Sequence, residues 1–188
     1  MKKTIILAIA AGFAMAANAA NETFVFDNNH SFARFGYNHF GYSNQQSRFD
    51  SMNGKIVIDR AAKTGSVEVT IDPKSVSTGS TQFNGHLQGE DFLDSAKYPT
   101  ITYKSTKFTF SGDKLVSVDG NLTLKGVTKP VTLKVTSFQC QPHPLLKKDA
   151  CGANVTAQIK RTEFNAGKYA PYVGDEVTLT FTVEVIKE

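Results

Sequence analysis

Hydrophobic and polar residues alternate along most of this chain, and the alternation is clearest between residues 116 and 135. Successive side chains of a β-strand point to opposite faces of a sheet, so each alternating run predicts a strand with one apolar and one polar face. Residues 125–130 lie between two such runs, and their glycine and proline predict the loop of an antiparallel hairpin. A two-stranded hairpin is only marginally stable in water, so this one requires further strands.

Runs of the same kind occur on both sides of the hairpin and predict about eight strands in sequence-adjacent order. After a short extended piece at 23–27, the strands cover residues 31–40, 52–58, 67–71, 101–110, 116–124, 131–138, 153–159 and 177–185. Phe49 stands at an odd position and Met52 at an even one (opposite parities), so on an uninterrupted strand their side chains would face opposite sides of the sheet. We expect a β-bulge between Phe49 and Gly54, because one extra residue turns every later side chain to the other face.

These strands predict an all-β fold, since the chain shows neither a repeat nor a rhythm of alternating strands and helices. Eight such strands remove their exposed edges by closing into an up-and-down antiparallel β-barrel, whose interior is filled by side chains or holds one small ligand. A sandwich of two sheets is the alternative, because alternation does not distinguish two packed faces from one rolled face.

Shared parity within each strand assigns a set of mostly apolar side chains to the barrel interior. The apolar parity of the central hairpin also includes Val116 and Val118. The residues predicted to face the interior and to contact a ligand there are Ala33, Phe35, Tyr37, Val67, Val69, Ile101, Tyr103, Leu122, Leu124, Val131, Leu133, Val135, Leu179, Phe181 and Val183.

Residues 75–99 lack this period and predict a short helical crossing between strands. Ser80 or Thr81 is a suitable N-cap for one helix, and Gly89 separates it from a second helix expected at 90–97. Four apolar side chains of the crossing either form a lid over the barrel mouth or belong to a plain connector packed on the barrel. They are Phe83, Leu87, Phe92 and Leu93.

Residues 1–19 have the composition of a cleaved secretory signal peptide. Two lysines precede an apolar run, and Ala-Asn-Ala at 17–19 predicts cleavage after Ala19. The run is shorter than the roughly 18 residues of a membrane-spanning helix. The remaining residues, 20–188, suffice for one β-domain with its own core. We expect the chain to be exported, to the periplasm, the cell surface or the medium.

Charge and motifs argue against several classes of function. Removal of residues 1–19 leaves 19 basic and 17 acidic residues, and the resulting net charge of +2 is too small to indicate nucleic-acid binding. The sequence has no GxSxG, HExxH, phosphate-loop or dinucleotide-binding motif. Its histidines are scattered, and His30 and His39 fall on opposite parities of one strand. We therefore expect no catalytic residues, no metal site and no cofactor.

The two cysteines, Cys140 and Cys151, enclose a short loop. In an exported protein they are expected to form a disulfide, which stabilises the fold by about 3 kcal/mol if it is unstrained. The alternative is a metal site that also includes His143. It lacks a fourth ligand at the usual spacing and conflicts with an oxidising compartment.

The chain resembles the YceI-like family in three segments: HSFARFGYNHFGY at 30–42, GHLQGEDFLDSAKYPTITYKST at 85–106 and GNLTLKGVTKPVTLKV at 120–135. KRTEFN at 160–165 and GDEVTLTFTVEV at 174–185 add to the resemblance, which extends over residues 20–188. It implies an extended lipocalin-like, eight-stranded antiparallel barrel in the bacterial periplasm. It also implies that the barrel holds a polyisoprenoid chain, such as a polyprenyl quinone or a polyprenyl phosphate. The segment between the cysteines departs from the family pattern and leaves the head group open.

We accordingly predict that the chain binds, transports or stores an isoprenoid lipid without catalysis. Each buried methylene contributes about 0.8 kcal/mol, so a few isoprene units outweigh the cost of association. The expected partners are this lipid and, through transient contact, a membrane, while both a monomer and a dimer are compatible with the sequence. The alternatives are an adhesion or interaction module on a β-sandwich and an esterase-like enzyme, which the absence of a nucleophile motif disfavours.

Overall fold

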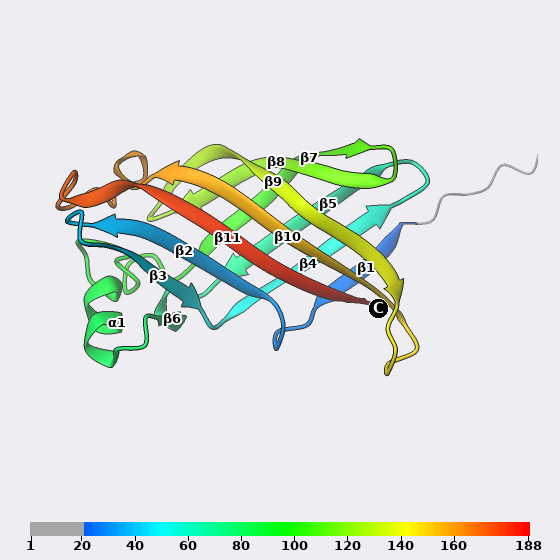
Figure 1. The fold of residues 1–188 in the computed structure, drawn as a ribbon, viewed down its shortest axis with the longest axis horizontal. Coiled ribbons are helices and arrows are strands. Elements are labelled where there is room, and N and C mark those ends of the chain that lie inside the picture. Colours follow the sequence, from blue (N-terminus) through cyan, green and yellow to red (C-terminus); the bar gives the residue numbers. More distant parts are fainter. Residues whose placement is uncertain (1–20) are drawn as a thin grey trace, which may run out of the picture.

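In the computed structural model, which describes residues 21–188, the alternating runs form the strands of a single antiparallel sheet (Figure 1). The strands are β1 (Glu22–Phe26), β2 (Phe32–His39), β3 (Ser43–Phe49), β4 (Met52–Asp59), β5 (Thr64–Ile71), β6 (Val76–Ser77), β7 (Ile101–Ser111), β8 (Lys114–Leu124), β9 (Val127–Pro142), β10 (Asp149–Lys160) and β11 (Val173–Lys187). The helices are η1 (Pro73–Ser75), α1 (Thr81–Gln88) and η2 (Arg161–Phe164). Among residues 21–188, no helix is long and apolar enough to span a membrane.

The sheet closes on itself because β11 pairs with β2 over most of its length and with β1 at its end. Three of the eight long strands of the barrel are interrupted, since β1 continues into β2, β3 into β4, and β5 into β6. The prediction of an eight-stranded antiparallel barrel is confirmed. Residues 21–188 form one closed sheet and no second sheet, as the sandwich that was the alternative would require.

At two of the three interruptions the regular ladder of backbone hydrogen bonds is broken. Side-chain hydrogen bonds bridge one of them, and a short irregular segment forms the other. Between β1 and β2, the buried Ser31 hydroxyl donates to the Glu184 carbonyl and accepts from the Glu184 N–H, both at 2.9 Å. Between β3 and β4, residues 50–51 form a break where the sequence predicted a one-residue bulge. The irregularity therefore lies where it was expected, and it leaves both Phe49 and Met52 buried.

The central hairpin has a shorter turn than the sequence predicted. Lys125 and Gly126 alone form it, both with positive φ (49° and 77°), as in the two-residue turns that join antiparallel strands. Pro130, expected in the loop, lies inside β9. The ladder between β9 and β10 ends at Lys134, so Pro130 lies on a free edge of β9, which is where proline is tolerated in sheets.

A bulge between β7 and β8 changes the predicted register of one residue. The register shifts between Thr109 and Phe110, so that Leu115 pairs with Phe110. Leu115 is consequently buried, whereas Val116, which parity placed on the apolar face, does not line the interior.

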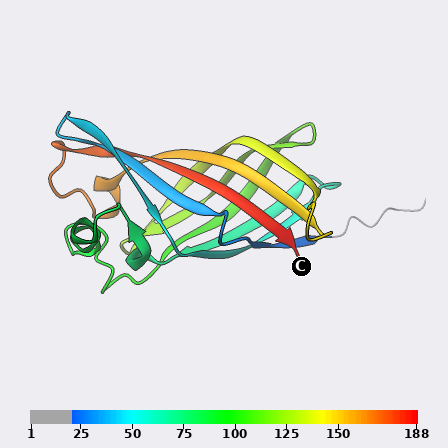
Figure 2. The same ribbon diagram turned by 60° about the horizontal axis from the view of Figure 1, so that its bottom comes forward.

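The two ends of the barrel differ (Figures 1 and 2). The helix end carries α1, the β2–β3 turn and the loop 161–172, whereas the terminal end carries the C-terminus and the β9–β10 loop.

Ser80 caps α1 by accepting a hydrogen bond from the Phe83 N–H, as predicted, and α1 ends at Gly89. Residues 90–97 form turns, so the second predicted helix is wrong. Backbone hydrogen bonds tie these residues to the end of α1, and they form no continuous helix.

Ion pairs fix the first strand at the terminal end. The carboxylate of Glu22 on β1 accepts hydrogen bonds from Arg60 Nε and Nη2 (2.8 and 3.0 Å) and from Lys187 Nζ on β11 (2.8 Å). These bonds, those from Arg60 foremost, hold the pKa of Glu22 below its ordinary value. Glu22 thus links β1 to the strands on both of its sides.

Candidate binding cavity

The barrel interior contains two apolar cavities, which we call the terminal cavity and the helix-end cavity. The space free of protein atoms is about 980 Å³ in the terminal cavity and about 880 Å³ in the helix-end cavity, including the parts open to solvent. The two cavities adjoin inside the barrel, and we refer to them together as the channel. Five residues line both: Ile71, Ile101, Leu122, Leu179 and Phe181.

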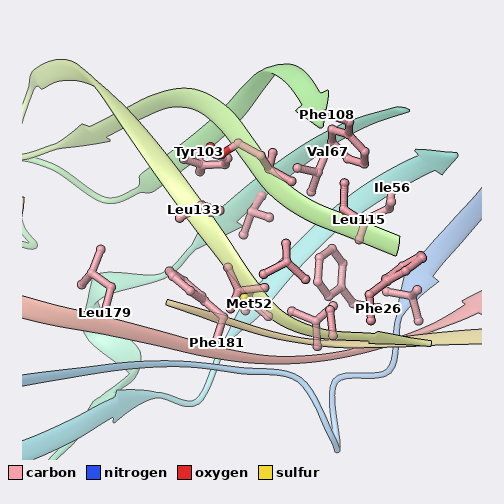
Figure 3. A pocket seen from close by; sticks show the side chains of 18 of the residues that line it. Phe26, Met52, Ile56, Val67, Tyr103, Phe108, Leu115, Leu133, Leu179 and Phe181 are labelled. Carbon is pink, nitrogen blue, oxygen red and sulfur yellow. Dashed lines mark hydrogen bonds between the residues drawn. The ribbon is translucent and has the colours of Figure 1, made fainter. Parts of the chain in front are cut away.

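Apolar side chains from β4, β5, β7–β11 and the end of β1 point into the terminal cavity (Figure 3). Its outer end is filled by a second core cluster of Phe24, Ile58, Cys151 and Val185, each at most 5% exposed. Phe26 and other aromatic rings pack against this cluster. The channel is therefore closed by packed side chains at the terminal end.

A polar group of the terminal cavity is satisfied within the protein. The Tyr103 hydroxyl lies 2.9 and 3.1 Å from the carbonyl oxygens of Val118 and Val131, and burial raises the pKa of Tyr103. The ring crosses Gly120 so closely that a Cβ there would lie 2.5 Å from Tyr103 Cζ and 2.6 Å from the Lys104 carbonyl oxygen. Gly120 is thus required for the ring to lie in the wall.

The crossing segment covers the helix-end cavity. Leu87 of α1 and the following Phe92 and Leu93 line this cavity together with residues of β2 and β11. The Leu93 N–H donates to the Leu87 carbonyl (3.0 Å), which folds the segment back onto the end of α1. The Tyr169 hydroxyl donates to Asp91 (3.2 Å) and joins the segment to the loop 161–172.

The structure brings the sequence-predicted interior residues together. All of those predicted to face the interior line one of the two cavities or both. Of the four crossing residues, Leu87, Phe92 and Leu93 line the helix-end cavity, whereas Phe83 packs against the core cluster without lining it. Their roles as ligand contacts and as a lid stay predictions.

Other residues that line the cavities were not selected as site residues, and several of them lie outside the predicted strands. In the terminal cavity they include Phe26, Met52, Ile56, Ile58, Phe108, Leu115, Val118, Phe138, Cys151 and Val155, and in the helix-end cavity Phe49, Ile159, Arg161, Ala166, Val173 and Val177. Arg161 is the one with different chemistry. Its signal in the sequence was its parity, because it continues the inward series of Ala157 and Ile159.

The predicted disulfide is confirmed. Cys140 and Cys151 face each other across β9 and β10, with their Cα atoms 4.0 Å apart, and are bonded. The bond uses both thiols, which excludes the alternative metal site with His143. His143 instead accepts hydrogen bonds at Nδ1 from the N–H groups of Leu145 and Leu146 (3.2 and 3.1 Å).

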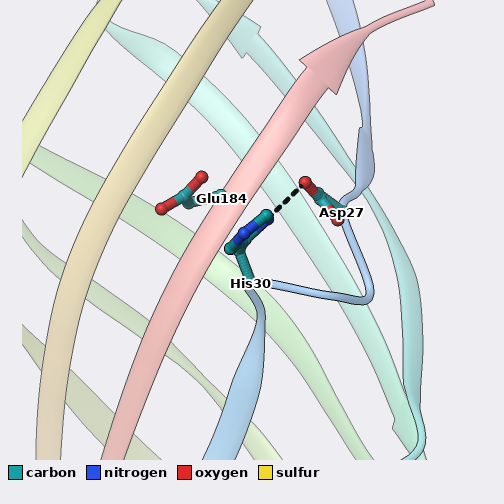
Figure 4. A group of neighbouring side chains, drawn as sticks. All are labelled: Asp27, His30 and Glu184. Atoms are coloured by element: carbon teal, nitrogen blue, oxygen red, sulfur yellow. Dashed lines mark hydrogen bonds and ion pairs between the residues drawn. The ribbon is translucent and has the colours of Figure 1, made fainter.

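His30 and His39 lie at opposite ends of β2. His30 Nδ1 pairs with Asp27 Oδ2 at 2.8 Å, which raises the pKa of His30, and Glu184 lies close to both (Figure 4). These three side chains are close enough together to hold a metal ion. His30 and Glu184 are exposed, and the ion pair accounts for the contact between Asp27 and His30.

Comparison with known sequences gives a family match over nearly all of the described chain. The sequence model of the YceI-like domain matches residues 24–185. "Protein YceI" of Escherichia coli O6:H1 is 34% identical over 195 residues, which cover all of both chains.

Solved structures show the same fold. Burkholderia cenocepacia BcnA superposes with a TM-score of 0.72 at 26% identity, over 85% of this chain and 98% of that one. A polyisoprenoid binding domain from Saccharophagus degradans, described as implicated in plant cell wall breakdown, superposes with a TM-score of 0.66 over 90% of this chain and all of that one. At 18% identity, the latter similarity is evidence for the fold.

Proposed function

The chain belongs to the YceI-like domain family, and from this premise we propose that its barrel binds an isoprenoid lipid by enclosing the hydrocarbon tail. The observation that carries the proposal is the pair of adjoining apolar cavities inside the barrel, which share five lining residues. The Saccharophagus degradans domain of the same fold is named for polyisoprenoid binding and supports the choice of ligand. The family and its structural neighbours point to a binding protein rather than to an enzyme.

The channel suits a long, branched hydrocarbon for a physical reason. An apolar tail needs no directional contacts, and each buried methylene contributes about 0.8 kcal/mol. A C20 tail that is fully enclosed therefore gains up to roughly 16 kcal/mol, which exceeds the several kcal/mol lost in association. Ligand length is limited because packed side chains close the terminal end.

A carrier or storage role in the periplasm is part of the proposal. The Cys140–Cys151 disulfide supports an oxidising compartment. The predicted signal peptide, residues 1–19, lies outside the described residues. Exchange of such a tail with a membrane is supported by exposed aromatic residues at the helix end, where Tyr42 and Tyr172 are 90% and 71% exposed.

The proposal is tested by a charge placed inside the channel. Leu179 lines both cavities, whereas Thr180, next to it on β11, points outward. We expect Leu179→Asp to abolish retention of a C20 isoprenoid in native mass spectrometry and Thr180→Asp to leave it unchanged. Circular dichroism and a denaturant titration confirm that both variants are folded. Equal retention by the two variants, or no retention by the parent protein, contradicts the proposal.

A further inference from the structure

The loop between β9 and β10, residues 143–148, ends in two leucines and two lysines, and we call these four residues the loop tip. Leu145 and Leu146 are 84% and 55% exposed, and Lys147 and Lys148, which follow them, are exposed as well. The loop projects from the barrel at its terminal end (Figure 1). Single exposed apolar residues are common on protein surfaces, whereas two adjacent leucines on a projecting loop form a patch that indicates a partner.

Several bonds hold the loop in this conformation. The Cys140–Cys151 disulfide joins β9 and β10 close to the base of the loop. The N–H of His143 donates to the carbonyl of Lys148 (2.7 Å), and the His143 ring accepts at Nδ1 from the N–H groups of both leucines. A loop whose conformation is fixed in advance loses less conformational entropy when it binds, so the exposed leucines are available for contact at little cost.

The charges of the loop tip favour an anionic partner. Neither Lys147 nor Lys148 makes an ion pair with a carboxylate within residues 21–188. The loop tip itself contains no acidic residue. The next residue, Asp149, lies 3.7 Å from Arg60 Nη2 and 3.9 Å from Lys187 Nζ, so two other cations offset its charge. The ammonium groups of the loop tip are therefore available to anions outside the protein.

We propose that the loop tip docks the protein on an anionic lipid bilayer, with its two leucines at the boundary of head groups and acyl chains and its two lysines beside lipid phosphates. Apolar burial and attraction to anionic head groups add in this arrangement, which is why leucines beside lysines suit such a surface. The loop tip lies at the end of the barrel that packed side chains close. Docking there is consequently independent of the proposed isoprenoid ligand, and it is separate from the aromatic residues of the helix end.

The size and charge of the loop tip favour a bilayer over a protein partner. A stable protein interface buries roughly 800 Å² on each side and involves about 20–30 residues, whereas the loop tip offers two apolar side chains. A bilayer needs no such area, because its fluid lipids close around a narrow projecting loop. A symmetric contact with a second copy of this chain would bring four lysines together, and repulsion between like charges disfavours it.

The test measures how the purified protein partitions onto vesicles in a co-sedimentation assay. Vesicles of phosphatidylglycerol and phosphatidylcholine in equal parts are compared with vesicles of phosphatidylcholine alone, and we expect the parent protein to prefer the former. The double variant Lys147→Gln/Lys148→Gln should weaken this binding about 10- to 30-fold, since each lysine near an anionic surface contributes about fivefold. The double variant Leu145→Ser/Leu146→Ser should weaken it at least about tenfold.

Lys107→Gln/Lys134→Gln is the matched control, because it removes two exposed lysines from β7 and β9 and changes the net charge equally. It should weaken vesicle binding less than about threefold, since salt screens charges that lie away from the surface. Retention of an isoprenoid in native mass spectrometry should be the same in all these variants, which separates this inference from the proposed function.

A fluorescent reporter identifies the end of the barrel that touches the bilayer. The chain contains no tryptophan, so Leu145→Trp places a single reporter in the loop tip and Tyr42→Trp places one at the helix end. We expect brominated lipids in the anionic vesicles to quench the reporter in Leu145→Trp more strongly.

Three results overturn the proposal. They are equal or stronger quenching in Tyr42→Trp, binding of the loop-tip variants as tight as that of the parent, and no preference of the parent for anionic vesicles. In the last case, a dimer in analytical ultracentrifugation that Leu145→Ser/Leu146→Ser abolishes would identify a second copy of this chain as the partner instead.

Discussion

Phe92 offers a test of whether the crossing segment opens or is only part of the wall. Its side chain is partly buried and lines the helix-end cavity, and its ring lies 4.9 Å from the His86 ring and 6.1 Å from the Tyr169 ring. Replacing a fully buried phenylalanine by alanine costs about 3–5 kcal/mol of folding free energy. Because Phe92 is only partly buried, we expect Phe92→Ala to cost about 2 kcal/mol.

The kinetics of ligand exchange separate a lid from a wall. Loss of a phenyl contact with the ligand accounts for about 1–2 kcal/mol, so release should become about 5- to 30-fold faster. If the segment must open before the ligand passes, Phe92→Ala also speeds association, and the dissociation constant changes less than the release rate. A wall residue affects release and affinity together and leaves association unchanged.

The assay follows transfer of a fluorescent isoprenoid between the protein and lipid vesicles in both directions by stopped flow. Phe138→Ala is the control, because Phe138 is also a half-buried phenylalanine that lines the channel but lies in the terminal cavity. We expect faster association in Phe92→Ala alone. If its association rate is unchanged and its release rate rises only in proportion to the dissociation constant, the lid hypothesis is refuted and Phe92 is a wall residue.

Three further predictions concern the barrel itself. Gly120→Ala should destabilise the protein by about 2–4 kcal/mol in a urea titration, because the added Cβ displaces the Tyr103 ring and its hydroxyl bonds; a loss below about 1 kcal/mol would contradict this. Replacing both Cys140 and Cys151 by serine should cost about 3 kcal/mol and lower the melting temperature by roughly 6–12 °C, and an unchanged melting temperature speaks against a stabilising bond. The lowered pKa of Glu22 stabilises the fold fully above its unfolded value of about 4.3 and progressively less as pH falls through the folded value. Glu22→Gln should therefore be about 1 kcal/mol less stable than the parent near pH 7 and equally stable near pH 2.5, and a pH-independent difference would show that ionisation is not the cause.

Sequence reasoning predicted the barrel and its inward-facing residues because both depend on a period of two. The alternation holds along each stretch of strand between bulges, so residues such as Leu133 and Phe181 could be assigned to the interior before any contact was known. It failed where the register shifts locally. Because of the bulge beside Phe110, Leu115 faces the interior where alternation predicted Val116. Alternation alone does not indicate on which residue a bulge falls.

The chain outside the strands was harder to predict. Pro130 was expected in a loop because proline is rare in paired strands, and only the end of the β9–β10 ladder explains its place. The crossing shows the same limit. The Ser80 cap is a local signal and was found, whereas residues 90–97 follow contacts with the end of α1 that the sequence does not display.

The residues that break the inward apolar pattern are more informative about specificity than those that obey it. For folding alone, an apolar side chain of similar size at the position of Arg161 avoids the cost of taking a cation out of water. Four backbone carbonyls offset that cost and explain how the cation is tolerated at the lining of the helix-end cavity. Departures from local folding rules tend to mark functional positions. An apolar channel selects for a tail by length and width, so discrimination between lipids that share one tail depends on the polar side chains of its lining, such as Arg161.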